Sequence, residues 1–299
     1  MTTPTLDSLR GTTGLWTMTL DAQPVASLRS IVAELDGLGV SALWLPESWG
    51  REALVNASLA LQASTRMVIA TGIASIWARD AVASVNGART LSAASGERFV
   101  LGLGVSHRPL VERLRGHHYE NPVAAMRAYL EAMDAAPMHA ADADERTPRV
   151  IAALGPKMLE LAASHADGAH TYLVTTEHTA TARAHLGTAF LAVEQAVVLG
   201  ATREEFLARA HAHLDFYTGL ENYRNNWKRL GFSDDDFVRG GSERLCDAMV
   251  VHGNEHAVLA AVDEHRSAGA HHVCIQVLGE DMTTPPLHEW RLIADALRG

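Results

Sequence analysis

Residues 67–107 read MVIATGIASIWARDAVASVNGARTLSAASGERFVLGLGVSH, and this stretch decides the fold of the chain. Its two ends, residues 67–75 and 99–106, are runs of Val, Ile, Leu and Ala typical of buried strands, and the segment between them has the length of one helix. Such a unit predicts neighbouring parallel strands of an α/β protein. Glycine weakens the interior of a strand unless another group approaches the backbone closely. We therefore expect a flat or bulky group beside Gly72, Gly102 and Gly104, and a binding site at these strand ends, where α/β proteins hold their ligands.

The same alternation of strand and helix continues on both sides of this stretch. Its helices carry start signals, such as Asp80, a good N-cap, and Asn121 followed by Pro122. The strands are expected at residues 14–18, 42–47, 68–73, 99–105, 150–154, 168–174, 191–199 and 272–278. Strands that alternate with helices in this way predict a single (β/α)8 TIM barrel over residues 1–299, and an open doubly wound sheet is the competing topology.

Residues 201–270 interrupt the alternation before the last strand. They open with a capping box, Thr202 followed three residues later by Glu205, and apolar residues follow at helical spacing. We therefore expect a helical insertion between the seventh and eighth strands. Within it, Tyr223 and Trp227 stand four residues apart, so that a helix would pack both rings inward. In the alternative, this segment folds over the mouth of the barrel and touches the substrate.

Composition and charge argue against several classes of partner. The chain has 25 basic and 35 acidic residues and a net charge of −10, so that nucleic acid and anionic membrane surfaces are not expected as its main ligands. Its start shows no secretory signal, and no apolar run approaches the ~18 residues of a membrane span. The two cysteines, Cys246 and Cys274, are expected to be buried, reduced thiols of a cytoplasmic protein.

The histidine content, 16 residues, raises the question of a metal site. No H-E-x-x-H motif and no cluster of cysteine with histidine occurs, and His211 and His213 would point to different faces of a helix. We therefore expect no metal. The remaining alternative is a barrel hydrolase, which can gather its metal ligands from distant strands.

Polar residues follow several expected strands, at the end where a barrel binds its ligand. These residues are Glu47, Ser75, Ser106 and His107. The segment Gly155-Pro156-Lys157-Met158 follows the fifth strand, and its helix start and lysine favour an anion such as phosphate, the alternative being an ordinary turn. Gly102-x-Gly104 is only part of a dinucleotide fingerprint, so that it indicates a Rossmann fold weakly.

Several phrases, in their order and spacing, resemble the luciferase-like superfamily, and most closely its F420-dependent oxidoreductases. The phrases are LWLPES (43–48), VIATGIASIWARDA (68–81), RFVLGLGVSH (98–107), ALGPKMLELAASHADGAHTYLV (153–174) and AGAHHVCIQVL (268–278). The similarity extends over nearly the whole chain and is weakest at residues 1–12 and 130–147. The resemblance implies a TIM barrel that binds the deazaflavin coenzyme F420, with hydride transfer to or from its ring.

The resemblance also implies where the coenzyme would lie. In relatives the third strand carries a bulge with a non-prolyl cis peptide bond behind the ring, and the matching bond is Gly72–Ile73. The alternative is a plain strand glycine at a barrel corner. Residues 105–107 would face the polar edge of the ring, and residues 155–158 would surround the phosphate. The coenzyme-binding residues expected are therefore Gly72, Ile73, Ala74, Ser75, Gly104, Val105, Ser106, His107, Gly155, Pro156, Lys157 and Met158.

His107 is the first candidate for handling the proton that accompanies hydride transfer, because an imidazole titrates near neutral pH. Its alternative role is that of a hydrogen-bonded structural histidine. Glu47 is the second catalytic candidate, and its alternative is an ion pair with Arg51 or a neighbouring arginine. Arg79 either contacts the coenzyme or pairs within the chain. The substrate-binding candidates are Trp16, Trp77 and Tyr223, with Trp16 as a filler of the barrel core in the alternative.

The function expected from the sequence is a cytoplasmic F420-dependent oxidoreductase that acts on a small organic molecule. The sequence shows no group of basic residues that would bind a phosphorylated sugar. We therefore do not expect the sugar-phosphate substrate of some family members. A homodimer is expected through the helices near residues 53–63 and 80–95, as in relatives. The alternatives are an FMN-dependent two-component monooxygenase of the same fold, a metal-assisted barrel hydrolase, and a coenzyme-binding protein without turnover.

Overall fold

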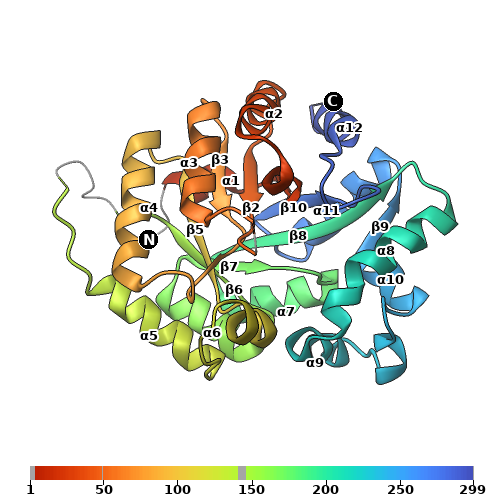
Figure 1. The fold of residues 1–299 in the computed structure, drawn as a ribbon. Helices are drawn as coiled ribbons and strands as arrows, with labels where there is room; N and C mark the ends of the chain where they lie inside the picture. Colours follow the sequence, from red (N-terminus) through yellow and green to blue (C-terminus); the bar gives the residue numbers. More distant parts are fainter. Residues whose placement is uncertain (1–3, 49, 141–145, 299) are drawn as a thin grey trace.

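The computed structural model describes residues 4–48, 50–140 and 146–298. Within them, parallel strands form a closed ring, because β10 pairs with β1 on one side and with β8 on the other (Figure 1). The ring consists of β1 (Thr12–Trp16), β2 (Ala42–Leu45), β3 (Val68–Thr71), β5 (Phe99–Gly104), β6 (Arg149–Ala152), β7 (Gly168–Thr171), β8 (Phe190–Leu199) and β10 (His272–Val277). The predicted (β/α)8 barrel is therefore confirmed, and this closure excludes an open doubly wound sheet.

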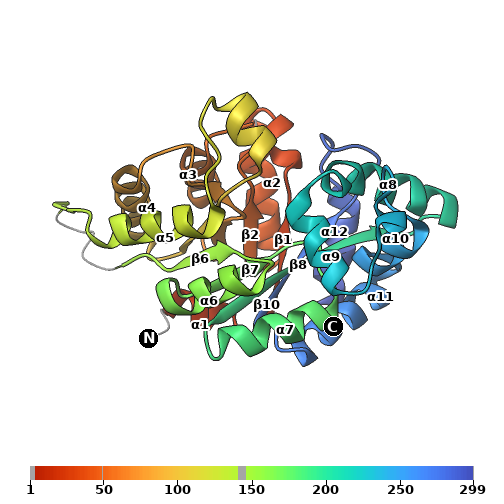
Figure 2. The same ribbon diagram turned by 90° about the horizontal axis from the view of Figure 1, so that it is seen from below.

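Helices surround the ring of strands (Figures 1 and 2). Those that cover the barrel are α1 (Pro4–Leu9), α2 (Val25–Gly37), α3 (Ala53–Ala63), α4 (Ala81–Ser95), α5 (Pro122–Asp134), α6 (Pro156–His165), α7 (Thr176–Leu186), α11 (Glu255–Ser267) and α12 (Leu287–Ala296), with the short turns η1 (Thr19–Ala22) and η2 (Leu110–Leu114). The Asp80 side chain accepts a hydrogen bond from the Ala83 amide at 2.8 Å. Asn121 accepts from the amides of Val123 and Ala124, each at 3.1 Å. Both predicted caps are confirmed, and they satisfy amides that have no partner in the first turn.

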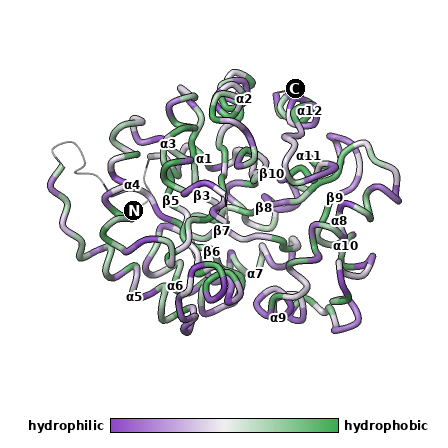
Figure 3. The backbone as a smooth tube through the Cα atoms, in the orientation of Figure 1, coloured by the Kyte–Doolittle hydropathy of each residue, from purple (hydrophilic) through white to green (hydrophobic). Residues whose placement is uncertain are grey.

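Alternate side chains of the strands belong to two apolar layers. Trp16, Trp44 and Phe190 point inward and fill the barrel, and each is at most 4% exposed. Leu43 and Ile69 point outward and pack against the surrounding helices. Figure 3 shows the resulting pattern, with hydrophobic colour along the strands and hydrophilic colour on many outer turns.

Helix α1 is not anticipated by the sequence analysis, which expects its first element at residue 14. Its Leu6 and Leu9 are buried in the same layer as Val68 and Val100, which stand near the beginnings of β3 and β5. The helix therefore closes the end of the barrel opposite to the strand ends that bind ligands in this fold.

Strand β8 is ten residues long and pairs beyond the barrel with an additional strand, β9 (Val250–Gly253). The helices between these two strands are α8 (Arg203–Thr218), α9 (Glu221–Arg229), η3 (Asp234–Phe237) and α10 (Glu243–Met249). The expected insertion is mostly helical, but it contains a strand that was not predicted, because two valines carry no periodic pattern. Helix α11, expected within the insertion, instead packs Val258 and Val262 into the outer layer of the barrel.

In the described part of the chain, no helix has both the length and the apolar character that crossing a membrane requires.

Candidate active site

The third strand of the barrel is interrupted at the point where the sequence predicted a bulge. Strand β3 ends at Thr71, and the Gly72–Ile73 peptide bond is cis, which confirms the prediction. A short strand, β4 (Ala74–Ser75), then resumes the pairing with β5. The indole Nε1 of Trp16 donates to the Gly72 carbonyl at 2.9 Å, so that a buried ring from β1 supports the interruption.

The glycines beside this interruption are required by the protein's own packing. A Cβ at Gly72 would lie 2.7 Å from Nε1 of Trp16, and a Cβ at Gly104 would collide with the side chain of Ile73. Close approach to the backbone was predicted correctly, but the approaching groups belong to the chain itself. Gly72 and Gly104 are therefore no direct evidence for a ligand.

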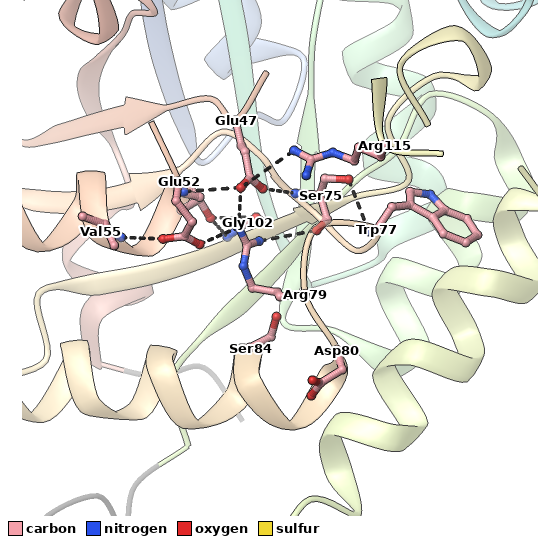
Figure 4. A network of polar contacts seen from close by, with 12 residues as sticks. Glu47, Glu52, Val55, Ser75, Trp77, Arg79, Asp80, Ser84, Gly102 and Arg115 are labelled. Atoms are coloured by element: carbon pink, nitrogen blue, oxygen red, sulfur yellow. Dashed lines mark hydrogen bonds and ion pairs between the residues drawn. The ribbon is translucent and has the colours of Figure 1, made fainter. Parts of the chain in front are cut away.

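Glu47 holds the backbone on both sides of the interruption (Figure 4). Its amide donates to the Ile73 carbonyl at 3.0 Å, and its Oε2 accepts from the Ser75 amide at 2.8 Å. Its Oε1 forms an ion pair with Arg79, and Nη2 of Arg115 lies 4.0 Å from the same oxygen. The side chain is only 4% exposed. Glu47 is therefore placed to position the β3–β4 backbone.

Arg79 and Arg51 are both engaged within the chain. Nη2 of Arg79 also lies 2.5 Å from Oε1 of Glu52, and Nη1 donates to the Ser75 carbonyl at 3.4 Å. Arg51 donates to backbone carbonyls, among them that of Leu20 at 2.7 Å, so that the arginine that pairs with Glu47 is Arg79. With its side chain 9% exposed, Arg79 serves this internal network.

The segment after β5 forms a second border of the site. Nε1 of Trp77 donates to the Val105 carbonyl at 2.9 Å. Ser106 has a φ of +53°, a left-handed conformation that side chains rarely adopt and that is common at functional sites. The half-buried ring of His107 lies 5.7 Å from that of Tyr223 and 5.9 Å from that of Phe216, centroid to centroid.

Burial lowers the pKa of His107 to about 4, and a hydrogen bond with the Asn222 side chain opposes this shift only in part. The expectation that this imidazole titrates near neutral pH is therefore wrong, because transfer of the charged form out of water is unfavourable. At pH 7 His107 is neutral, and it can accept a proton or a hydrogen bond but has no extra proton to give.

The start of α6 offers donors for an anion. Gly155 is the N-cap and Pro156 occupies the first turn, as predicted, and the amide groups of such a turn favour negative charge. Lys157 is exposed beside them. Arg229 of α9 reaches the same place, because its Nη2 lies 3.7 Å from the Cβ position of Gly155. Two cationic side chains at a helix start suit a phosphate group, such as those of flavin-type coenzymes.

Arg229 is a residue that the sequence analysis missed. It stands more than seventy positions after Gly155, and no local pattern links the two. The only signal for Arg229 in the sequence is its place at the basic end of α9. The two basic residues before it, Arg224 and Lys228, both pair with Asp234. The Arg229 guanidinium donates to Oδ1 of Asn226 at 3.0 Å.

The residues expected to bind coenzyme or substrate divide into an accessible and a buried group. The accessible or half-buried ones are Ile73, Trp77, Val105, Ser106, His107, Gly155, Pro156 and Lys157. The buried ones are Trp16, Gly72, Ala74, Ser75, Gly104, Met158 and Tyr223. The second group therefore has little accessible surface, and Met158 in particular packs its side chain into the outer apolar layer between the strands and the helices.

Trp77 lies apart from the other two substrate candidates. Its ring contacts are His117 and Tyr119, with centroids at 6.4 and 6.2 Å. The rings of Trp16 and Tyr223 each contact the ring of Tyr172, with centroids at 5.2 and 6.5 Å. Tyr172 therefore lies between these two candidates.

Among the described residues, no group of three or more His, Cys, Asp or Glu side chains is arranged to hold a metal ion.

The fold and the site together define the class of the protein, which is that of the closed parallel α/β barrels. At its strand ends lie a helix start that favours an anion and an interrupted third strand. Its family follows from comparison with known proteins. The chain belongs to the luciferase-like monooxygenase family, whose model matches residues 9–272.

Individual relatives include enzymes of both kinds expected from the sequence. A provisionally assigned coenzyme F420-dependent oxidoreductase of Mycobacterium tuberculosis is 31% identical over 110 residues, which are 37% of this chain and 32% of that protein. The match therefore spans about a third of that relative's length.

Solved structures share the fold at low identity. An F420-dependent secondary alcohol dehydrogenase in complex with an F420–acetone adduct superposes with a TM-score of 0.73 at 12% identity, over 97% of this chain and 100% of that one. The oxygenating constituent of 3,6-diketocamphane monooxygenase from Pseudomonas putida, in complex with FMN, gives a TM-score of 0.70 at 13% identity, over 96% and 98%. Family membership makes the chain an enzyme of the luciferase-like oxidoreductases and monooxygenases.

Proposed function

We propose that this protein is an F420-dependent oxidoreductase, which transfers a hydride between the deazaflavin coenzyme and a small organic molecule. The observation that carries the proposal is the donor set at the start of α6, which consists of the amide groups of its first turn, Lys157 within that turn, and Arg229, which reaches Gly155 from α9. This donor set fits the phosphate of the coenzyme, and it lies at the same strand-end face as the Gly72–Ile73 interruption. The named F420 enzymes among the relatives support the choice of coenzyme.

The residues of the site divide the work of binding. Ile73 and residues 105–107 are accessible and would border the coenzyme ring, while Glu47 and Trp16 hold the backbone behind it. A bound deazaflavin supplies the hydride-carrying carbon, and the protein supplies orientation and electrostatics. His107, neutral at pH 7, can take up a proton from the substrate or hold it by a hydrogen bond.

An FMN-dependent monooxygenase is the second candidate function. The donor set at α6 suits the phosphate of FMN as well, and a structural neighbour binds FMN. A metal-assisted hydrolase is not carried forward, because the family model assigns the chain to a redox family.

Titration with each coenzyme tests the proposal. We expect the purified chain to quench the fluorescence of F420 on binding and to bind FMN at least tenfold more weakly. Arg229→Ala should weaken coenzyme binding about tenfold, because a charge-assisted hydrogen bond contributes roughly 1.5–3 kcal/mol. Arg239→Ala is the matched control, since the Arg239 side chain is 91% exposed and pairs with Asp215.

The outcomes separate the candidate functions. Tight FMN binding without a response to F420 would favour the monooxygenase. Binding of F420 without turnover of any carbonyl compound would reduce the proposal to a coenzyme-binding protein. Binding of neither coenzyme would contradict both functions.

A further inference from the structure

Aromatic side chains from β1, α8, α9 and the segments that follow β5 and β7 meet beside the proposed coenzyme site. We call this group the ring cluster, and it consists of Trp16, His107, Tyr172, His213, Phe216, Tyr217 and Tyr223. The sequence analysis found only three of these residues, because the others stand after β7 and on α8, where they look like ordinary helix and loop residues.

Tyr172 is at the centre of the ring cluster. Its centroid lies 5.2 Å from that of Trp16, 5.5 Å from that of Tyr217 and 6.3 Å from that of His213. Tyr217 lies 4.9 Å from Tyr223, and these distances are typical of interacting aromatic pairs. The rings thus form a continuous path from β1 to the insertion helices.

One end of this path adjoins the interrupted third strand. Trp16 donates to the Gly72 carbonyl, and His107, at the end of β5, contacts Phe216 and Tyr223 of the insertion. The ring cluster therefore borders the proposed coenzyme site on the side of α8 and α9.

The ring cluster is sheltered and still reachable. Tyr172, Tyr217, His107 and His213 keep part of their surface accessible, and Phe216 is 40% exposed. Burial nevertheless raises the pKa of Tyr217 to about 12 and lowers that of His213 to about 4. Side chains that are accessible and yet poorly hydrated are suited to contact a ligand.

The hydrogen-bond partners of the ring cluster are neutral groups. Within the described residues, none of its rings makes a hydrogen bond, an ion pair or a cation–π contact with Lys, Arg, Asp or Glu. A carboxyl group that acts electrostatically on Tyr172 and Tyr217 is that of Glu194 on β8, which is 1% exposed. Burial raises the pKa of Glu194 to about 8, so that this group is mainly protonated at neutral pH.

Neutral hydrogen-bonding groups complete the wall. The Tyr217 hydroxyl donates to that of Tyr172 at 3.2 Å, and the Tyr172 hydroxyl donates to Oε1 of Gln276 at 2.7 Å. Nε2 of His213 lies 3.4 Å from the Tyr172 hydroxyl. Each phenol hydroxyl has one donor and can also accept, so that a ligand carbonyl could replace Tyr172 as the acceptor of the Tyr217 proton, and a ligand hydroxyl could donate to either oxygen, without introducing a charge.

We propose that the ring cluster is the substrate site and that it takes an uncharged, flat aromatic molecule with a carbonyl or hydroxyl group. This inference rests on the proposed function for its redox role, but it concerns binding alone. Stacking against the accessible rings of Tyr217 and Phe216 would favour such a molecule. An anionic or cationic substrate would lose its hydration with no opposite charge to replace it.

The experiment compares coumarin with coumarin-3-carboxylate, which share a ring system and differ by one charge. Binding of each to the full chain without coenzyme is measured by ligand-observed NMR titration. We expect coumarin to bind at least tenfold more tightly than the carboxylate. Equal binding, or tighter binding of the carboxylate, would overturn the proposal.

Variants assign the binding to the ring cluster. Phe216→Ala should weaken coumarin binding about fivefold. Because Phe216 is 40% exposed, this variant should fold, and circular dichroism checks that it does. Tyr217→Leu should weaken binding further, whereas Tyr217→Phe should retain most of it. Tyr129→Phe is the control, because Tyr129 contacts Ser84 and the Arg79 carbonyl, away from the cluster. Unchanged binding in Phe216→Ala and Tyr217→Leu would overturn the assignment.

The result can be separated from that of the coenzyme titration. A chain that prefers coumarin but binds neither F420 nor FMN contradicts the proposed function and leaves the selectivity of this site standing. A chain that binds F420 but prefers the carboxylate contradicts only the substrate class.

Discussion

Glu47 illustrates how one carboxylate can be essential to a site without reaching its ligand. It accepts from the Ser75 amide and pairs with Arg79, and its own amide donates to the Ile73 carbonyl. All of these contacts hold the backbone that would back the coenzyme ring. We therefore regard Glu47 as a positioning residue, whereas His107 is the residue with accessible surface toward the substrate side.

His107→Ala should lower turnover by 10²-fold or more while changing coenzyme affinity by less than threefold, because general acid–base groups typically contribute 10²–10⁴-fold. Since the pKa of His107 is lowered to about 4, its neutral form persists above pH 5, and kcat should show no acid limb from this residue between pH 5 and 8. Steady-state kinetics and fluorescence titration measure both quantities. His256→Ala, at a side chain 82% exposed, is the control, and unchanged turnover in His107→Ala would remove the proposed role.

Three barrel strands carry buried titratable side chains, and their effects on stability have opposite signs. Burial lowers the pKa of His170 on β7 to about 4 and that of His272 on β10 to about 3. Burial raises the pKa of Glu194 on β8 to about 8. Below about pH 6.5 the two histidines therefore bind protons more readily in the unfolded chain than in the folded protein, which disfavours folding. Between about pH 4.5 and 8 the glutamate binds a proton more readily in the folded protein, which favours folding.

Acidification from pH 7 to pH 5 should therefore destabilise the protein. His170 alone should account for a loss of about 2 kcal/mol in the free energy of unfolding, since one unit of pKa shift corresponds to 1.36 kcal/mol. Urea denaturation at both pH values measures this loss, and it should shrink by a similar amount in His170→Phe. Glu194→Gln should instead enlarge the loss between pH 7 and pH 5, because it removes the carboxyl group whose proton uptake favours the folded state over this range and so opposes the effect of the histidines. An identical acid limb in His170→Phe would contradict the assignment.

The ring strands were predicted within two or three residues of their observed ends, because each is a compact apolar run bounded by turn residues. Local signals also gave the caps at Asp80 and Asn121. The elements that were missed, α1 and β9, are short, and tertiary packing determines them more than any local pattern does. Within the site, residues near the strand ends were found, whereas Arg229 and Tyr172 depend on contacts between distant segments that one sequence does not reveal.

At the scale of the whole molecule, we propose that the chain forms a homodimer through α3 and α4, which lie next to each other in Figure 1. Val55 of α3 is 58% exposed and Val82 of α4 is 43% exposed, and water contact with such side chains is unfavourable. Light scattering should give twice the chain mass for the native protein and a larger monomer fraction for the Val55→Glu, Val82→Glu double variant. Val238→Glu, at a residue 54% exposed in the insertion, is the control. A monomeric native protein would contradict the proposal.

Strand β8 also bears on how a compound could enter the molecule. It belongs to the barrel in its first part, leads directly into α8, and pairs in its last part with β9, which ends the insertion. A segment fastened at both ends to one continuous strand has no single hinge about which to swing. We therefore expect α8 and α9 to keep their place beside the barrel, so that a different choice of substrate would arise from exchanged side chains on these helices and not from a movement of the insertion.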